Sequence, residues 1–193
     1  GIFNEFGSKV TIANRSGVIL RSYVPALRDR LLQISLGKGI EFCFNTEFEW
    51  VKRQENSSLL VKMTGYDERV FDQVMIATGR VPNTQGLGLE KVGVELGDNG
   101  ESKVDAFSKT NLDHIYAVGD VTDRVQLTPV AIREGQAFAD SVFGSGEPYA
   151  VDHSCIPSAV FSHPPIAAVG MTEGEARNSL GNVRVYQSAF RPR

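Results

Sequence analysis

The sequence has 193 residues, of which 41% are hydrophobic and 22% are charged, and its formal net charge is −3. A chain of this length can bury one substantial hydrophobic core or two small ones. No apolar run is long enough to cross a membrane and no basic surface is indicated, so we expect neither a membrane nor a nucleic acid as a partner.

The first quarter of the chain predicts alternating helices and strands. Gly7 is typical of a C-terminal stop, because glycine tolerates the left-handed conformation that follows many helices. Apolar residues then recur at helical spacing after Pro25, and Gly39 ends that stretch. The regular elements expected here are a helix end at 1–6, a strand at 9–13, a helix at 25–38 and a strand at 40–44.

The next stretch predicts an antiparallel meander followed by one buried strand. Alternating apolar and polar residues between 47 and 71 are interrupted by polar turns at 55–58 and 65–67, which gives three strands. The buried strand is expected at 74–77 and leads into Gly79. A glycine at the carboxyl end of a sheet strand allows a ligand to approach the backbone closely.

The central stretch begins after a region of loop and short strands expected at 87–105. An apolar run at 115–118 favours a buried strand that presents the carboxylate of Asp120 at its carboxyl end, where open α/β sheets bind ligands. Thr128 is expected to cap the next helix and Pro129 to be its first residue. The free N–H groups at such a helix start favour negative charge. The local pattern alone is more typical of an ordinary turn. The apolar face expected for this helix contains Val130, Ala131, Gly135, Phe138 and Val142.

The last fifty residues predict a further unit with both helix and strands. The run from Gly144 to Pro148 is expected to break the preceding helix and to mark a boundary. Thr172 is expected to cap a helix within 171–180, and Glu175 to complete a capping box. Strands are expected at 158–161, 167–170 and 183–190.

Two arginines follow the strand expected at 9–13. In dinucleotide-binding folds, an acid near this point accepts from the ribose of NAD, whereas an arginine accommodates the 2′-phosphate of NADP. This strand end has no acid, and Arg15 and Arg21 lie nearby. A guanidinium can hold two phosphate oxygens at once, although the spacing alone favours two solvated surface arginines.

Cysteine and histidine give little sign of chemistry. Cys43 and Cys155 form no Cys-x-x-Cys pair, so we expect no disulfide framework and no metal site, but two buried or half-buried thiols in a reducing compartment. His163 is interpreted as structural, and His114 and His153 give still weaker signals. Residues 1–7 lack the features of a signal peptide, so the cytoplasm or an organelle with a reducing interior is expected.

Three motifs resemble the glutathione reductase family of FAD-dependent disulfide oxidoreductases. They are ATGRVPN at 77–83, IYAVGDVTDRVQLTPVAIREG at 115–135 and IPSAVFSHPPIAAVGMTEGEA at 156–176. In that family the aspartate of the second motif binds the ribityl chain of FAD, and the Leu-Thr-Pro helix points its N-terminus at the flavin. The resemblance therefore assigns FAD contacts to Asp120 and Thr128.

The same resemblance implies NADPH contacts. An arginine pair with the spacing of Arg15 and Arg21 binds the 2′-phosphate of NADPH in the family, which reverses the preference for surface arginines. The other residues that match pyridine-nucleotide contacts are Gly79, Gln126 and Val160, with Arg80 as a neighbouring candidate.

The resemblance also implies parts of three domains in one α/β chain. Residues 1–79 correspond to the C-terminal part of a Rossmann-like NADPH-binding domain with an antiparallel meander. Residues 80–150 correspond to the second segment of the FAD-binding domain, and residues 151–193 to the beginning of an α+β dimer-interface domain. The family's CxxxxC redox disulfide, its glycine-rich turns and its C-terminal His-Glu pair are expected outside this sequence, so no catalytic residue is expected within it.

The function implied is that of a homodimeric NADPH- and FAD-dependent reductase of glutathione disulfide. Many glutathione reductases, though not all, carry an arginine that binds a glutathione carboxylate where this chain has Gln136. Trypanothione and mercuric reductases stay open, because the residues that distinguish them lie mostly outside this sequence. Lipoamide dehydrogenases fit less well, because they favour an acid at the nucleotide strand and lack Leu-Thr-Pro. The alternative from another class is a non-catalytic NADPH-binding module.

Overall fold

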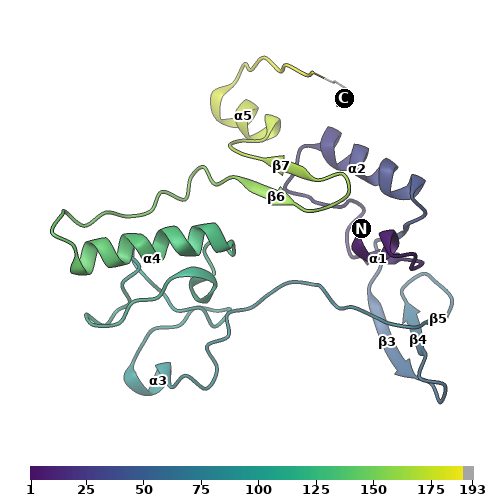
Figure 1. The fold of residues 1–193 in the computed structure, drawn as a ribbon, viewed down its shortest axis with the longest axis horizontal. Coiled ribbons are helices and arrows are strands. Elements are labelled where there is room, and N and C mark those ends of the chain that lie inside the picture. Colours follow the sequence, from purple (N-terminus) through teal and green to yellow (C-terminus); the bar gives the residue numbers. More distant parts are fainter. Residues whose placement is uncertain (189–193) are drawn as a thin grey trace. The chain divides into compact units, whose positions relative to one another are not determined.

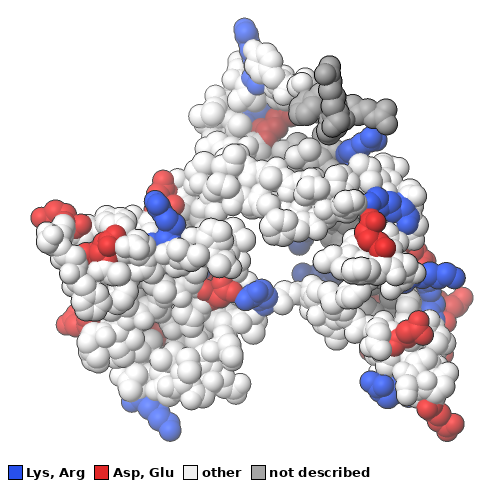
Figure 2. All heavy atoms as spheres, in the orientation of Figure 1, with Lys and Arg blue, Asp and Glu red and all other residues white. Residues whose placement is uncertain are grey.

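The computed structural model describes residues 1–188, which form two compact units (Figure 1). The first unit contains Gly1–Ile76 and the chain from Pro157 onward, and the second contains Ala77–Ile156. Helices occur with both parallel and antiparallel strands, which confirms the α/β class. Among the described residues, no helix has the length and apolar character needed to cross a membrane. Basic and acidic side chains are interspersed on the face shown in Figure 2.

The first unit begins with a strand–helix–strand arrangement. The short helix α1 (Ile2–Glu5) precedes β1 (Thr11–Asn14), which pairs in parallel with β2 (Glu41–Phe44). The helix α2 (Pro25–Gly37) connects the two strands, and its Leu31 is buried. These elements follow the predicted order, because each has its signal in its own residues: the helical apolar stripe, the glycine after the helix, and the short apolar strands.

The antiparallel meander was also predicted correctly. It consists of β3 (Phe48–Arg53), β4 (Leu59–Met63) and β5 (Arg69–Phe71), with β4 in the middle. Val61 and Met63 of β4 and Cys43 of β2 form a fully buried core cluster. The β1–β2 sheet and the β3–β4–β5 sheet therefore share one core.

The rest of the first unit is a two-stranded sheet with a capped helix. The strands β6 (Ser158–Val160) and β7 (Ile166–Ala168) pair antiparallel, and α5 (Glu173–Leu180) follows them. The hydroxyl of Thr172 accepts from the backbone N–H of Glu175 at 3.3 Å, and the carboxylate of Glu175 accepts from the backbone N–H of Thr172 at 2.7 Å. This reciprocal arrangement is the predicted capping box.

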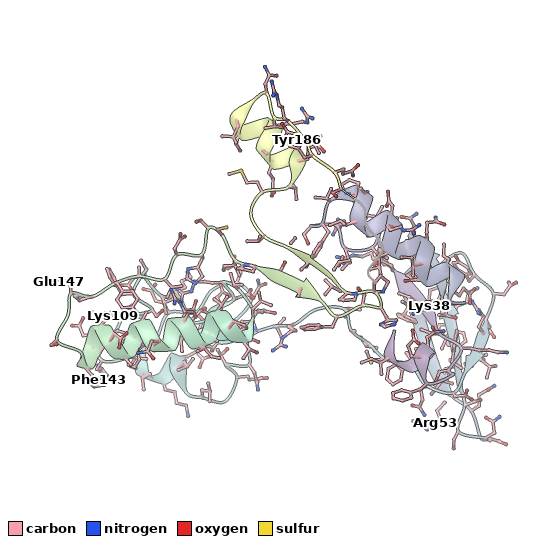
Figure 3. The ribbon with its side chains drawn as sticks, turned by 45° about the horizontal axis from the view of Figure 1, so that its top comes forward. Lys38, Arg53, Lys109, Phe143, Glu147 and Tyr186 are labelled. Carbon is pink, nitrogen blue, oxygen red and sulfur yellow. The ribbon has the colours of Figure 1, made fainter. Side chains whose placement is uncertain are left out.

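The second unit is organised around one long helix. It contains α3 (Leu89–Val92), the 3-10 turn η1 (Gly119–Thr122) and α4 (Thr128–Phe143). Figure 3 shows α4 ending at Phe143, before the loop that contains Glu147. Phe138 packs on Tyr116 with ring centroids 4.9 Å apart, which joins α4 to the segment before η1.

Three expected strands are absent from the described residues. The stretches 74–77, 115–118 and 183–188 have no regular strand pairing, and residues 189–190 of the last one lie outside the described residues. Met75 and Ile76 are each 72% exposed, where burial was expected. A strand forms when a neighbour takes up its backbone hydrogen bonds, and in the described part of the chain no strand pairs with these stretches. Tyr116 makes a single bridge to Lys109.

Several local predictions also need correction. The region 87–105 contains the helix α3 as well as a bridge between Leu96 and Ser102. The helix α4 has Leu127 at its N-cap, so Thr128 is its first residue rather than its cap, and Pro129 is its second. Its buried residues are Val130, Glu134 and Ala137, whereas Val142 is exposed. Cys155 is exposed rather than half-buried.

Candidate nucleotide and flavin sites

The loop after β1 carries Arg15 and Arg21 and is ordered by an asparagine. Asn14, the last residue of β1, donates from its amide to the carbonyl oxygens of Ser16 at 3.0 Å and Val18 at 2.8 Å. The backbone carbonyl oxygen of Asn14 accepts from the backbone N–H of Thr46, which follows β2. Both arginines are exposed. The strand end thus uses its polar side chain to shape the loop, while the guanidinium groups face solvent and stay accessible to an anion.

Arg21 also lines an open groove of about 370 Å³ in the first unit. One wall is the start of α2 with Tyr23 and Arg28, and the other is the start of α5 with Arg177. Arg177 forms an ion pair with Glu173 at 2.8 Å, so part of its charge is already neutralised. Arg28 also forms an ion pair, with Asp29 at 3.4 Å. The positive charge of Arg21 suits a phosphate-bearing ligand.

In the second unit, Asp120 lies on a turn that packs closely against α4. Gly119 has a φ of +72°, and a side-chain carbon at this position would lie 3.0 Å from the Cβ of Ala131 in α4. Glycine is therefore required both by the backbone conformation and by the close approach of the helix. The next residue, Asp120, is held on a turn in contact with α4.

The carboxylate of Asp120 forms an ion pair with Arg80. The side chains are 41% and 70% exposed, respectively, and exposed pairs of this kind contribute at most about 1 kcal/mol. Ligand hydroxyl groups can compete with so weak a pair. Asp120 is thus a hydrogen-bond acceptor that is accessible from solvent.

The remaining candidates divide between the two units. Thr128 is exposed at the first position of α4, and Gln126 donates to Asp123 at 2.7 Å in the loop before it. Gly79 is exposed with a φ of +138°, a conformation that a residue with a side chain rarely adopts. Val160 ends β6 in the first unit. Asp120 and Thr128 therefore share one unit, whereas the five proposed NADPH contacts come from both.

A buried ionic cluster behind the Asp120 turn was not predicted from the sequence. Glu134 is 1% exposed, and its carboxylate bonds the backbone N–H of Gly119 at 2.6 Å, Arg124 at 2.9 Å and His153 at 2.7 Å. The sign of this cluster in the sequence is a glutamate between Val130 and Ala137, on the apolar side of the helix. Within the described residues, no group of side chains has the composition of a metal site.

Comparison with family models identifies two matching regions. Residues 1–135 match the model described as pyridine nucleotide-disulphide oxidoreductase. Residues 156–193 match the dimerisation domain of the same family.

Curated proteins with similar sequences are disulfide reductases. The chain is 48% identical to glutathione reductase of Burkholderia cepacia, 44% to trypanothione reductase of Trypanosoma congolense and 42% to the chloroplastic/mitochondrial glutathione reductase of Pisum sativum. Each match covers 100% of this chain but 42%, 39% and 35% of the respective relative. The chain thus spans well under half the length of these proteins.

Solved structures give the same resemblance. The HOCl-induced flavoprotein disulfide reductase RclA from Escherichia coli matches with a TM-score of 0.87 and 31% identity, over 94% of this chain and 41% of that one. LpdA from Mycobacterium tuberculosis matches with a TM-score of 0.83 and 30% identity, over 91% of this chain and 38% of that one.

Proposed function

The chain belongs to the pyridine nucleotide-disulphide oxidoreductase family, and from this membership we propose that it is part of an NADPH- and FAD-dependent reductase of glutathione disulfide. The family is one of oxidoreductases that use FAD and a pyridine nucleotide. Bound FAD supplies a two-electron carrier between the nicotinamide and a disulfide. The protein residues bind and orient these groups.

The observation that carries the proposal is the turn at Asp120. An accessible carboxylate next to a helix start offers an acceptor for hydroxyl groups and a partial positive charge for an electron-rich ring edge. The ribityl chain and the pyrimidine edge of FAD have these complementary features.

The nucleotide site is proposed on the loop after β1. Arg15 and Arg21 are exposed on an ordered loop without a strand-end acid, which supports recognition of a 2′-phosphate. By resemblance to the family, Gly79, Gln126 and Val160 contribute further contacts with NADPH. This arrangement selects NADPH over NADH.

The proposed domain organisation follows the same resemblance. Residues 1–79 belong to the NADPH-binding domain, residues 80–150 to the FAD-binding domain, and residues 151–193 to the dimer-interface domain. The match of residues 156–193 to a dimerisation domain supports a homodimer as the functional form.

The proposed substrate is glutathione disulfide, and a specific observation favours one alternative. The 44% identity to a trypanothione reductase is close to the 48% identity to a glutathione reductase. Gln136 is exposed on α4 and donates to Asp140 at 2.8 Å, so it offers an uncharged amide rather than a guanidinium. An experiment on substrate choice should therefore compare disulfides that differ in charge.

A disulfide panel tests the proposal. We expect the full-length protein to oxidise NADPH when glutathione disulfide is present, with a much smaller kcat/KM for NADH. Activity with trypanothione disulfide and none with glutathione disulfide would assign the alternative substrate. Oxidation of NADPH that depends on neither disulfide contradicts the proposed function.

A further inference from the structure

The buried carboxylate of Glu134 needs a physical explanation. Removing a charge from water costs several kcal/mol unless opposite charges and hydrogen-bond donors surround it. Glu134 is 1% exposed, and both of its oxygens have donors: Oε2 accepts from Gly119, while Oε1 accepts from Arg124 and His153. An apolar residue would fill this helix position at no such cost, so the bonding partners themselves point to a role.

The first partner fixes the backbone immediately before Asp120. The N–H of Gly119 donates to Glu134 Oε2 at 2.6 Å, a distance typical of a strong bond to a charged acceptor. Gly119 also packs closely on Ala131, which lies one turn before Glu134 in α4. The helix α4 therefore holds the turn at two points, one polar and one apolar.

The second partner braces the far side of the turn. Arg124 Nη2 lies 2.9 Å from Glu134 Oε1 and 2.9 Å from the hydroxyl of Ser108, and its Nε donates to Thr122 Oγ1 at 3.3 Å. Thr122 in turn donates to the carbonyl oxygen of Gly119 at 2.8 Å. The N–H of Gly119 thus bonds the buried carboxylate directly, and its carbonyl oxygen is linked to the same carboxylate through Thr122 and Arg124.

The third partner belongs to the segment after α4. His153 Nε2 lies 2.7 Å from Glu134 Oε1, and the His153 side chain is 24% exposed. A carboxylate oxygen accepts, so this ring nitrogen carries the hydrogen. Three chain segments therefore converge on one carboxylate behind the Asp120 turn.

We propose that Glu134 is a positioning residue for flavin binding, which acts by holding the Gly119–Asp120 turn so that the carboxylate of Asp120 is presented beside the start of α4. This inference rests on the proposed FAD contact of Asp120. Glu134 is buried and does not touch the ligand itself. Because Glu134 affects flavin affinity only through Asp120, replacing Glu134 should have little further effect once Asp120 has been replaced.

A double-mutant cycle on the full-length protein tests this expectation. The FAD dissociation constant is determined for folded apoprotein of Asp120→Ala, Glu134→Gln and the double variant, with apoprotein melting recorded for each. Asp120→Ala should weaken FAD roughly 10- to 150-fold, the loss of one charge-assisted hydrogen bond. Glu134→Gln should weaken FAD by about five-fold or more, a change worth about 1 kcal/mol, but by no more than Asp120→Ala does.

The decisive value is that of the double variant. Because Glu134 acts through Asp120, the double variant should bind FAD within about two-fold of Asp120→Ala alone, whereas independent effects would multiply. Asp140→Asn is the matched control, since Asp140 is a carboxylate outside the buried cluster on the same helix, and it should leave FAD affinity unchanged.

The other outcomes separate the two proposals. Two results would overturn the positioning role and leave the proposed function intact, both with weaker FAD binding in Asp120→Ala. In the first, the losses of FAD affinity from the two substitutions multiply in the double variant. In the second, Glu134→Gln binds FAD as tightly as the wild type. Unchanged affinity in Asp120→Ala overturns the flavin contact and the positioning role together. If Glu134→Gln does not fold, Arg124→Gln is used instead, because it removes the ion pair between Arg124 and Glu134. Combined with Asp120→Ala, it should again bind FAD within about two-fold of Asp120→Ala alone.

Discussion

Asp120 and Glu134 are carboxylates in the same unit with opposite surroundings. Asp120 is 41% exposed and has one solvent-accessible partner, Arg80, whereas Glu134 is 1% exposed and has three donors. An accessible acceptor can exchange its partner for a ligand, but a buried and fully bonded one cannot do so without a large cost. The surroundings thus separate a ligand-binding role from a positioning role.

Arg15 and Arg21 are the residues on which nucleotide choice should depend. Replacing both with Ala in the full-length protein should weaken NADPH binding by about 1.5–3 kcal/mol for each charged hydrogen bond that the substitution removes. NADH should be nearly unaffected, because it has no 2′-phosphate to hold. Steady-state kcat/KM values with each nucleotide measure the difference.

Arg53 provides the control for that experiment. It is an exposed arginine at the end of β3 and labelled in Figure 3, and it has no proposed role in nucleotide binding. Arg53→Ala should change neither kcat/KM value. Equal losses for NADPH and NADH in the double arginine variant would refute the 2′-phosphate assignment.

At the scale of elements, the predictable parts were those with local signals. The apolar stripe of α2, the polar turns of the meander and the capping box of α5 are all written in neighbouring residues. The expected strands at 74–77 and 115–118 carry similar apolar runs, but a strand also needs a neighbour. Their correct assignment depended on pairing that a single segment cannot reveal.

The candidate site was predictable to the extent that it depends on motifs. The motif around Asp120 and Thr128 indicated a flavin contact through family resemblance, and the role of each residue stays a prediction. The cluster at Glu134 was not found, because its partners Arg124 and His153 come from other segments and form no sequence pattern. A charged residue on the apolar side of a helix was the one local sign.

An ion pair joins the β1–β2 sheet to the β3–β4–β5 sheet in the first unit and should make the stability of that unit depend on pH. Arg69 in β5 donates to the carboxylate of Glu41 in β2 at 2.8 and 2.7 Å. Hydrogen bonds from Arg69 and then from the Thr11 hydroxyl hold the pKa of Glu41 below its usual value of 4.5. A lowered pKa means that the stabilisation is present above the unfolded-state pKa and is lost as pH falls through the folded-state value.

Glu41→Gln tests this dependence. Near pH 7 the variant should be less stable by about 0.2–1 kcal/mol, because the side chain of Glu41 is 48% exposed and solvent weakens the pair. The difference should shrink as pH falls below about 4.5, where the carboxylate of the wild type also becomes neutral. Melting temperatures of both proteins across this range provide the measurement. Glu49→Gln on β3 is the control, and a pH-independent difference would contradict the account.

At the scale of the whole molecule, the two units contribute different parts of the proposed chemistry. The first carries the arginine loop, and the second carries the Asp120 turn with its buried support. The sequence has two cysteines, Cys43 in the first unit and Cys155 in the second, and no CxxxxC pair. By resemblance to the family, we expect the proposed reductase activity to need a CxxxxC pair, which these 193 residues do not contain.

An anaerobic titration of the full-length protein tests the central claim most directly. The account predicts that NADPH bleaches the absorbance of the bound oxidised flavin, and that glutathione disulfide then restores it. The 193-residue chain alone should give no disulfide-dependent oxidation of NADPH. A full-length protein that binds no flavin, or whose NADPH-reduced flavin is reoxidised by neither glutathione disulfide nor trypanothione disulfide, would contradict the assignment to an NADPH- and FAD-dependent disulfide reductase.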